Sequence, residues 1–125
     1  GAVVTAAAQP RSTLELTWKA SHCCRTTLPA FITAAIPAGT ANLAVTMIDL
    51  DYPRYDHGGG SVPHRGGATE KIAEGALKNY RGPCPPNFSD SGHDYEFTVR
   101  ALAADGKSVL AIAQRKKNFS AGSVK

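Results

Sequence analysis

Residues 94–102 read Asp-Tyr-Glu-Phe-Thr-Val-Arg-Ala-Leu, and this stretch decides the fold class. Its apolar side chains occupy every second position and its polar ones lie between them: Tyr95, Phe97, Val99 and Ala101 against Glu96, Thr98 and Arg100. A period of two is typical of a strand with one buried and one exposed face. We therefore predict a β-strand here and, with the segments that follow, a mainly β fold.

Three further segments support the β prediction. Apolar and polar residues alternate over 12–18, which predicts a half-buried strand. Residues 42–49 are apolar at both parities, which predicts a central strand covered on both faces. Asp105-Gly106 precedes the apolar run 109–113 and favours a hairpin, with a short helix over 107–113 as the alternative.

The remaining segments connect these strands. Residues 34–41 contain a proline and a glycine and predict a turn, whereas 69–79 are compatible with one or two helical turns. Residues 49–63 and 80–93 are irregular, rich in Gly or Pro, and each adjoins a strand. Polar loops fixed to rigid strands are where functional residues concentrate, so we look for the site in these two segments.

Length and composition limit the classes of protein. A chain of 125 residues is long enough for one domain, predicted to span 1–125, with an extended segment at 1–11 and a tail at 120–125. No apolar run approaches the roughly 18 residues of a transmembrane helix, so the protein is not expected to be transmembrane. The net charge is +4, but the only cluster of three basic residues is Arg115–Lys117, without interleaved aromatics, and no nucleic acid is expected.

The cysteines and the N-terminus bear on the compartment. Cys84 can pair with Cys23 or with Cys24, which would imply an oxidising compartment; the alternative is two or three buried thiols. Residues 1–8 are small and apolar and resemble the end of a signal peptide. Together these features slightly favour a secreted or periplasmic protein over a cytoplasmic one.

The first irregular segment carries two carboxylates and a histidine. Asp49 and Asp51 are two residues apart at a strand end and are expected to point to the same side. We predict that His57 donates a hydrogen bond to a carboxylate and offers its other nitrogen to a ligand. The glycines at 58–60 would let backbone N–H groups approach an anion; alternatively, the aspartates cap turns and the glycines form an exposed loop.

The second irregular segment is stiff. Pro83, Pro85 and Pro86 predict an extended wall with few backbone donors, and His93 stands at the mouth of the 94–102 strand. This histidine is a candidate ligand group, although a lone histidine is more often structural.

Taken in order, these motifs resemble a known family. The order is Asp-x-Asp-x-Pro at 49–53, His57 beside glycines, Tyr-x-Gly-Pro-Cys-Pro-Pro at 80–86, and Gly-His-x-Tyr-x-Phe-x-Val at 92–99. The chain is similar in this respect to phosphatidylethanolamine-binding proteins, particularly the short prokaryotic members called Raf-kinase-inhibitor-like. The resemblance runs from about Leu28 to Phe119.

The resemblance implies an antiparallel β-sandwich with few short helices and a small pocket for phosphate, acetate or a phosphoethanolamine-like headgroup. The positions that match the family's pocket and its wall are Asp49, Asp51, His57, Gly82, Pro83, His93 and Tyr95. The sequence departs from the family at Leu50, where a proline is common, and at Asp94, where larger members often carry Arg.

These observations lead to a non-enzymatic binding protein, with no cofactor and no metal expected. No Gly-x-Ser-x-Gly elbow, Walker loop or His-Glu-x-x-His motif is present. Since imidazoles gain charge in mild acid, an anion should bind better there. One alternative is an inhibitor of a protease or kinase, with an unknown protein target. Another is a metal-dependent hydrolase built on four groups: Asp49, Asp51, His57 and His93.

Overall fold

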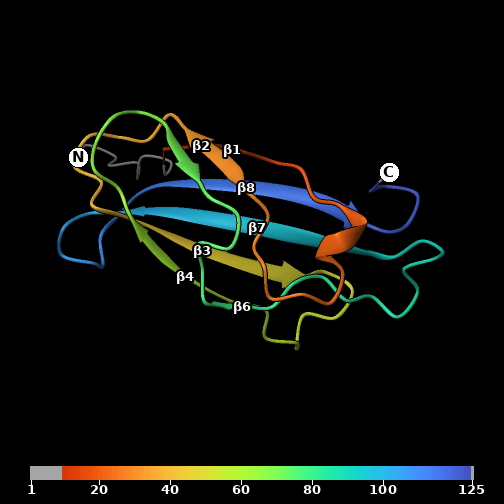
Figure 1. Ribbon diagram of the computed structural model, residues 1–125. Coiled ribbons are helices and arrows are strands. Elements are labelled where there is room, and N and C mark those ends of the chain that lie inside the picture. The colour runs from red at the N-terminus through yellow and green to blue at the C-terminus, as the bar shows by residue number, and fades with distance from the viewer. Residues whose placement is uncertain (1–9, 125) are drawn as a thin grey trace, which may run out of the picture.

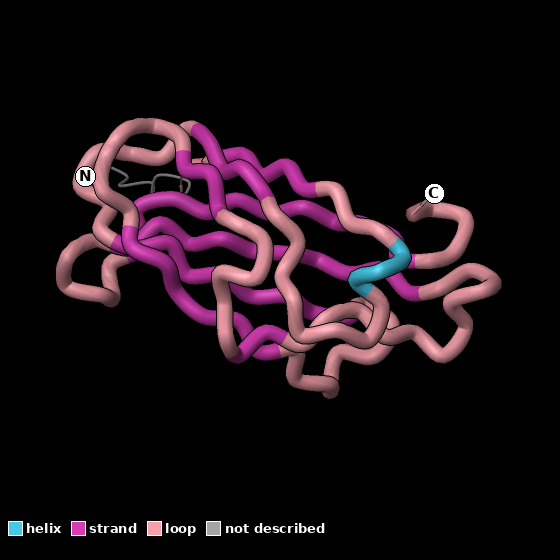
Figure 2. The backbone as a smooth tube through the Cα atoms, viewed as in Figure 1, coloured by secondary structure: helices cyan, strands magenta, loops and turns pink. Residues whose placement is uncertain are grey.

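The computed structural model describes residues 10–124 as a mainly β protein in which a three-stranded sheet packs on a five-stranded sheet (Figure 1). The smaller sheet has the order β1 (Thr13–Leu16), β2 (Phe31–Ala34), β5 (Glu70–Ile72). The larger sheet has the order β6 (Asn79–Tyr80), β4 (Gly58–Pro63), β3 (Asn42–Asp49), β7 (His93–Leu102), β8 (Val109–Phe119). All strand pairs in the two sheets are antiparallel, which confirms the predicted antiparallel β-sandwich. The only helical element over these residues is the 3-10 turn η1 (Ala20–His22), cyan in Figure 2.

The two ends of the chain differ in what can be described. The predicted signal-peptide remnant at 1–8 lies outside the described residues, as does most of the extended segment at 1–11. In the predicted tail, the backbone turns at Ser120, which is buried and accepts hydrogen bonds from the amides of Ser123 and Val124. Between residues 10 and 124, no helix combines the length and the apolar character that crossing a membrane requires.

Strand β7 is an internal strand of the larger sheet with one buried face, as its alternation predicts. It pairs with β3 on one side and with β8 on the other. Its apolar residues, Tyr95, Phe97, Val99 and Ala101, are all buried in the core between the sheets. The ring of Trp18, which follows β1, packs against Tyr95, Phe97 and Phe119 and joins the two layers at this end.

Strand β3 has the predicted bounds and the predicted internal position, but only one of its faces is covered. Leu43, Val45 and Met47 are buried, whereas Thr46 and Ile48 on the other face are exposed. The expectation of two covered faces is therefore wrong. The reason is that the smaller sheet packs on one side of the larger sheet, and on the other side Ile48 remains 39% exposed.

Strands β7 and β8 form the predicted hairpin, and the alternative helix over 107–113 does not form. Asp105 holds the turn by accepting hydrogen bonds from the hydroxyl and the amide of Ser108 and from the amide of Lys107. The same hydrogen bonds lower the pKa of the Asp105 carboxyl to about 2, with the Ser108 hydroxyl contributing most. Gly106 adopts a positive φ of 73°, as a tight hairpin turn requires.

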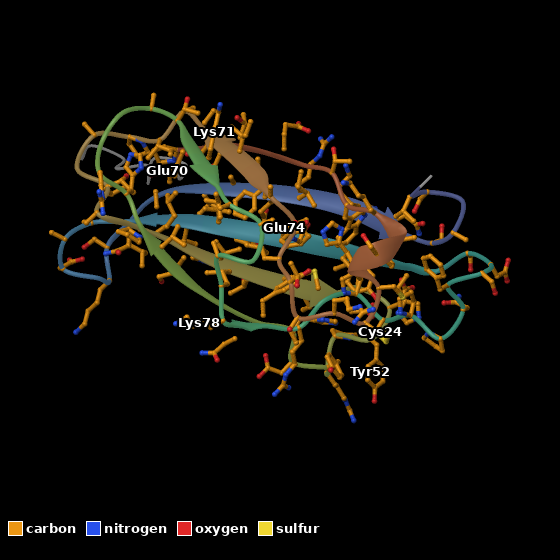
Figure 3. All side chains as sticks on the ribbon, in the orientation of Figure 1. Cys24, Tyr52, Glu70, Lys71, Glu74 and Lys78 are labelled. Atoms are coloured by element: carbon orange, nitrogen blue, oxygen red, sulfur yellow. A yellow bond between two sulfur atoms is a disulfide. The ribbon has the colours of Figure 1, made fainter. Side chains whose placement is uncertain are left out.

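The predicted helical turns over 69–79 are wrong. Residues 70–72 form β5 and pair with β2, which places Ile72 in the core. After β5, Gly75 has a positive φ of 75° and its amide donates to the carbonyl of Leu28, so the chain turns instead of coiling. Figure 3 shows Glu74 and Lys78 on the non-helical connection that leads from β5 to β6.

The glycines after His57 form neither the anion-holding loop nor the exposed loop that the sequence suggested. They belong to β4, between β3 and β6. A Cβ atom on Gly58 would lie 1.7 Å from the carbonyl oxygen of Asn79, and one on Gly59 would lie 2.1 Å from that of Val45. Both residues have positive φ values, so glycine is needed here for the close approach of neighbouring strands and not for a ligand.

Strand β8 is the long edge strand of the larger sheet, and its two halves are protected from pairing with another strand in different ways. Near its start, Arg11 forms a parallel bridge with Ile112, whose amide donates to the carbonyl of Pro10. Farther along, Arg115 pairs with a glutamate of β1 at 3.3 Å, and Lys116 is exposed. The first half of this edge is thus covered by the chain itself and the second half is charged.

Candidate functional site

A pocket of about 370 Å³ lies at the end of the sandwich where β3 ends and β7 begins. Asp49, the last residue of β3, faces Tyr95 of β7 across the ladder, so the loops that follow β3 and precede β7 meet there. The pocket is lined by both irregular segments: Asp49, Tyr52, Tyr55, His57, Cys84, Pro86, His93 and Tyr95. In Figure 3, Tyr52 and Cys24 mark this end of the molecule.

Asp49, which is buried, and His93, which is partly buried, form a hydrogen-bonded pair inside the pocket. The Asp49 Oδ2 atom lies 2.7 Å from His93 Nδ1, and Oδ1 accepts hydrogen bonds from the amides of Asp51 (2.9 Å) and Tyr52 (3.0 Å). Because a carboxylate only accepts, His93 Nδ1 carries a proton and donates it. Both oxygens of Asp49 therefore accept hydrogen bonds that hold His93 and the following loop in place. The Nε2 atom of His93 is left for a ligand.

His57 is held differently from the prediction. Its Nδ1 atom lies 2.7 Å from the carbonyl oxygen of Arg81 and not beside a carboxylate, so the expected carboxylate partner is wrong. A carbonyl is an acceptor, which again places a proton on Nδ1 and leaves Nε2 free. The buried ring packs edge-on to Tyr95 with centroids 5.5 Å apart, and it contacts Tyr55 at 4.6 Å.

Tyr95 contributes a hydroxyl without a partner. The residue is fully buried, and its hydroxyl lies close to the Asp49 carboxylate and the backbone of Cys84 without reaching hydrogen-bond geometry to either. Burial raises the pKa of this phenol, and the negative charge of the nearby Asp49 raises it further. The phenol therefore remains neutral at physiological pH and retains an unused donor, which is uncommon for a buried polar group.

Asp51, Gly82 and Pro83, which were also predicted as ligand-binding residues, support the pocket without lining it. Asp51 Oδ2 accepts from the amide of Asp94 at 2.7 Å and so ties the two loops together. Gly82 is buried, and a Cβ atom there would lie 2.5 Å from the carbonyl oxygen of Arg25. The carbonyl of Pro83 accepts from the amide of Cys24.

A disulfide forms part of the pocket wall. Of the two pairings that the sequence left open, the structure contains Cys24–Cys84, and Cys23 is a free thiol. The bridge links the loop after β1 to the proline-rich loop before β7. Two lining residues were not predicted: Tyr52 and Tyr55. The signal that could have found them is the pair of aromatic residues within four positions after the Asp-x-Asp motif.

Of the four side chains that the sequence offered as metal ligands, the structure brings three close together. Asp49, Asp51 and His93 each offer a ligand atom within 4.8 Å of the others, whereas His57 is not part of this group. The nearest atoms of these three residues already make hydrogen bonds to one another or to backbone amides. A cation would have to displace those bonds, so the geometry fits a hydrogen-bonded scaffold better than a set of four metal ligands.

No family model, curated protein or solved structure matches the chain. The similarity to phosphatidylethanolamine-binding proteins therefore stays a prediction from the sequence motifs.

Proposed function

We propose that the protein is a binding protein whose pocket takes a small anion of the phosphate or carboxylate type. The observation that carries this proposal is the convergence of three polar groups on one pocket. His57 and His93 each have Nδ1 engaged by an acceptor, and Tyr95 has an unused hydroxyl. When the imidazoles take up a second proton, all three side chains offer donors and none competes with the anion as an acceptor.

The charges around the site suit weak, pH-dependent binding. Asp49 offsets the charge of a protonated His93 and fixes its ring, so the imidazolium is oriented before the ligand arrives. Each charge-assisted hydrogen bond contributes about 1.5–3 kcal/mol, and association costs about 4 kcal/mol or more. Two or three such bonds therefore leave at most about 5 kcal/mol, which corresponds to an affinity of roughly millimolar.

The apolar wall indicates what is attached to the anion. Tyr52, Tyr55, Pro86 and the disulfide surround the polar end of the pocket. A bare inorganic ion would leave this wall in water, whereas an organic phosphate or carboxylate would cover it. A phosphoryl headgroup of the phosphoethanolamine type fits both parts, and this agrees with the proposed membership in the phosphatidylethanolamine-binding family.

A second candidate function has its own observation. The loop after β3 exposes Leu50, Tyr52 and Tyr55, whose exposed fractions are 43%, 57% and 46%. Large apolar side chains gathered at a pocket rim are typical of protein contacts. This supports an inhibitor or regulator that contacts a protein target through the rim, with the pocket receiving an acidic or phosphorylated side chain.

The experiment is a titration with inorganic phosphate and phosphoethanolamine, followed by ¹H–¹⁵N shift perturbation at pH 6 and pH 8. We expect shifts around His57 and His93, which line the pocket. His93→Asn retains an amide near the Nδ1 position but has no group at Nε2, and it is expected to abolish binding. His64→Asn is the matched control, because His64 is buried outside the pocket beside Glu70.

Two results would contradict the proposal. One is unchanged phosphate affinity in His93→Asn. The other is a set of shifts that maps to residues away from the pocket in the wild-type protein.

A further inference from the structure

A second hollow of about 240 Å³ adjoins the pocket. It is lined by Cys24, Arg25, Thr26, Tyr55, Arg81, Gly82 and Cys84. Tyr55 and Cys84 line both spaces, so the two hollows are neighbours across this ring and the disulfide. A ligand that fills the pocket and extends past Tyr55 would enter this hollow.

The walls of the hollow are fixed by covalent and backbone bonds. The amide of Gly82 donates to the carbonyl of Arg25 at 2.7 Å, and the amide of Cys24 donates to the carbonyl of Pro83 at 2.8 Å. Between these bonds lies the Cys24–Cys84 disulfide. Arg81 is bound through its amide to the carbonyl of His57 at 2.8 Å, so its position is tied to the pocket histidine.

Two cations in this hollow are not neutralised. Neither Arg25 nor Arg81 forms an ion pair with a carboxylate of residues 10–124, whereas Arg115 does. The guanidinium group binds phosphate and carboxylate through two parallel hydrogen bonds. Thr26 adds a hydroxyl to the same wall. Two unpaired arginines on a rigid frame therefore form a site suited to an anionic group.

We infer that the hollow is a second anion subsite and that the ligand is an elongated molecule with two anionic groups. One group would lie against His57 and His93, and the other against Arg25 and Arg81, with the linker passing over Tyr55. This inference rests on the proposed function, because it extends the same ligand. The chemical class is an organic bisphosphate or a phosphate ester that carries a carboxylate. Joining the two groups raises affinity because the second group binds at a high effective concentration.

The test compares inorganic phosphate with α,ω-alkanediol bisphosphates of two to eight carbons by isothermal titration calorimetry. We expect the best chain length to bind at least tenfold tighter than phosphate in the wild-type protein. In the double variant Arg25→Gln/Arg81→Gln, this advantage should disappear while the phosphate affinity changes less than threefold. The matched control is Arg11→Gln/Arg65→Gln, which removes two exposed arginines elsewhere and should keep the advantage.

The outcomes separate the two proposals. If phosphate binds and depends on His93, but no bisphosphate binds tighter, the second subsite is refuted and the pocket stands. If both double variants lose the advantage equally, net charge and not the hollow is responsible, and the inference is refuted. If phosphate does not bind the wild-type protein at all, the proposed function fails first.

Discussion

Removing the Cys24–Cys84 bridge is expected to lower the free energy of unfolding by about 4 kcal/mol at 25 °C. The two cysteines are 60 residues apart. In the loop-closure relation, a loop of this size removes about 14 cal/mol/K of entropy from the unfolded chain, which gives that figure. Both side chains are exposed, so the change Cys24→Ser/Cys84→Ser leaves no cavity in the core.

The assay is urea unfolding followed by the fluorescence of Trp18, the single tryptophan, which is buried against the aromatic cluster. Wild-type protein kept in reductant should match the double serine variant. Cys23→Ser, which retains the bridge, should lose less than about 1 kcal/mol because Cys23 is only partly buried. The dependence of stability on urea should also steepen without the bridge, since the unfolded chain becomes more extended.

A loss below about 1 kcal/mol in the double variant would refute the reasoning, because the entropic contribution of so long a loop is far larger. A thiol count on the native protein provides an independent check. It should find one free thiol, at Cys23. Three free thiols would show that the bridge is absent.

Three further predictions concern single residues. Gly59→Ala should lower the free energy of unfolding in urea by more than about 3 kcal/mol, because its Cβ would meet a carbonyl oxygen of the neighbouring strand. Gly122→Ala, which has open space around it and no positive φ, should change this free energy little. Equal losses in the two variants would contradict the argument from close approach. Asp105→Asn should be less stable than wild type at neutral pH, because the pKa of this carboxyl falls from 3.8 to about 2 on folding. In thermal unfolding, the difference in stability should persist above pH 4 and shrink as the pH falls towards 2. A difference that does not depend on pH would contradict this prediction. Tyr95→Phe should leave stability unchanged or raise it by about 1 kcal/mol, because the buried hydroxyl has no partner, and it should weaken phosphate binding; a clear loss of stability would show that the hydroxyl is satisfied.

The strands that the sequence predicted are those whose pattern is local. In β3 and β7, the side chains alternate within the segment itself, and the hairpin into β8 is marked by Asp105-Gly106. Strand β5 was missed because its residues are good helix formers and its pairing with β2 is a contact between distant segments. Strand β4 was missed because glycines have no side-chain pattern, and the need for Gly59 arises from the backbone of β3.

As with the strands, the sequence predicted some residues of the candidate site and missed others. The structure brings Asp49, His57, His93 and Tyr95 to one pocket, as expected from the motifs at the strand ends. The partner of His57 could not be predicted, because a backbone carbonyl has no residue type to mark it. The rim aromatics were missed for a related reason, since the path of an irregular loop depends on hydrogen bonds such as those accepted by Asp49.

The divided edge of β8 has a consequence for association between molecules. An unpaired edge of an 11-residue strand can recruit a strand from another copy, which is a common route to aggregation. Here the chain occupies part of that edge with Pro10 and Arg11, and farther along the exposed, charged side chain of Lys116 disfavours pairing with another strand. The fold and its charge thus protect this edge against self-association.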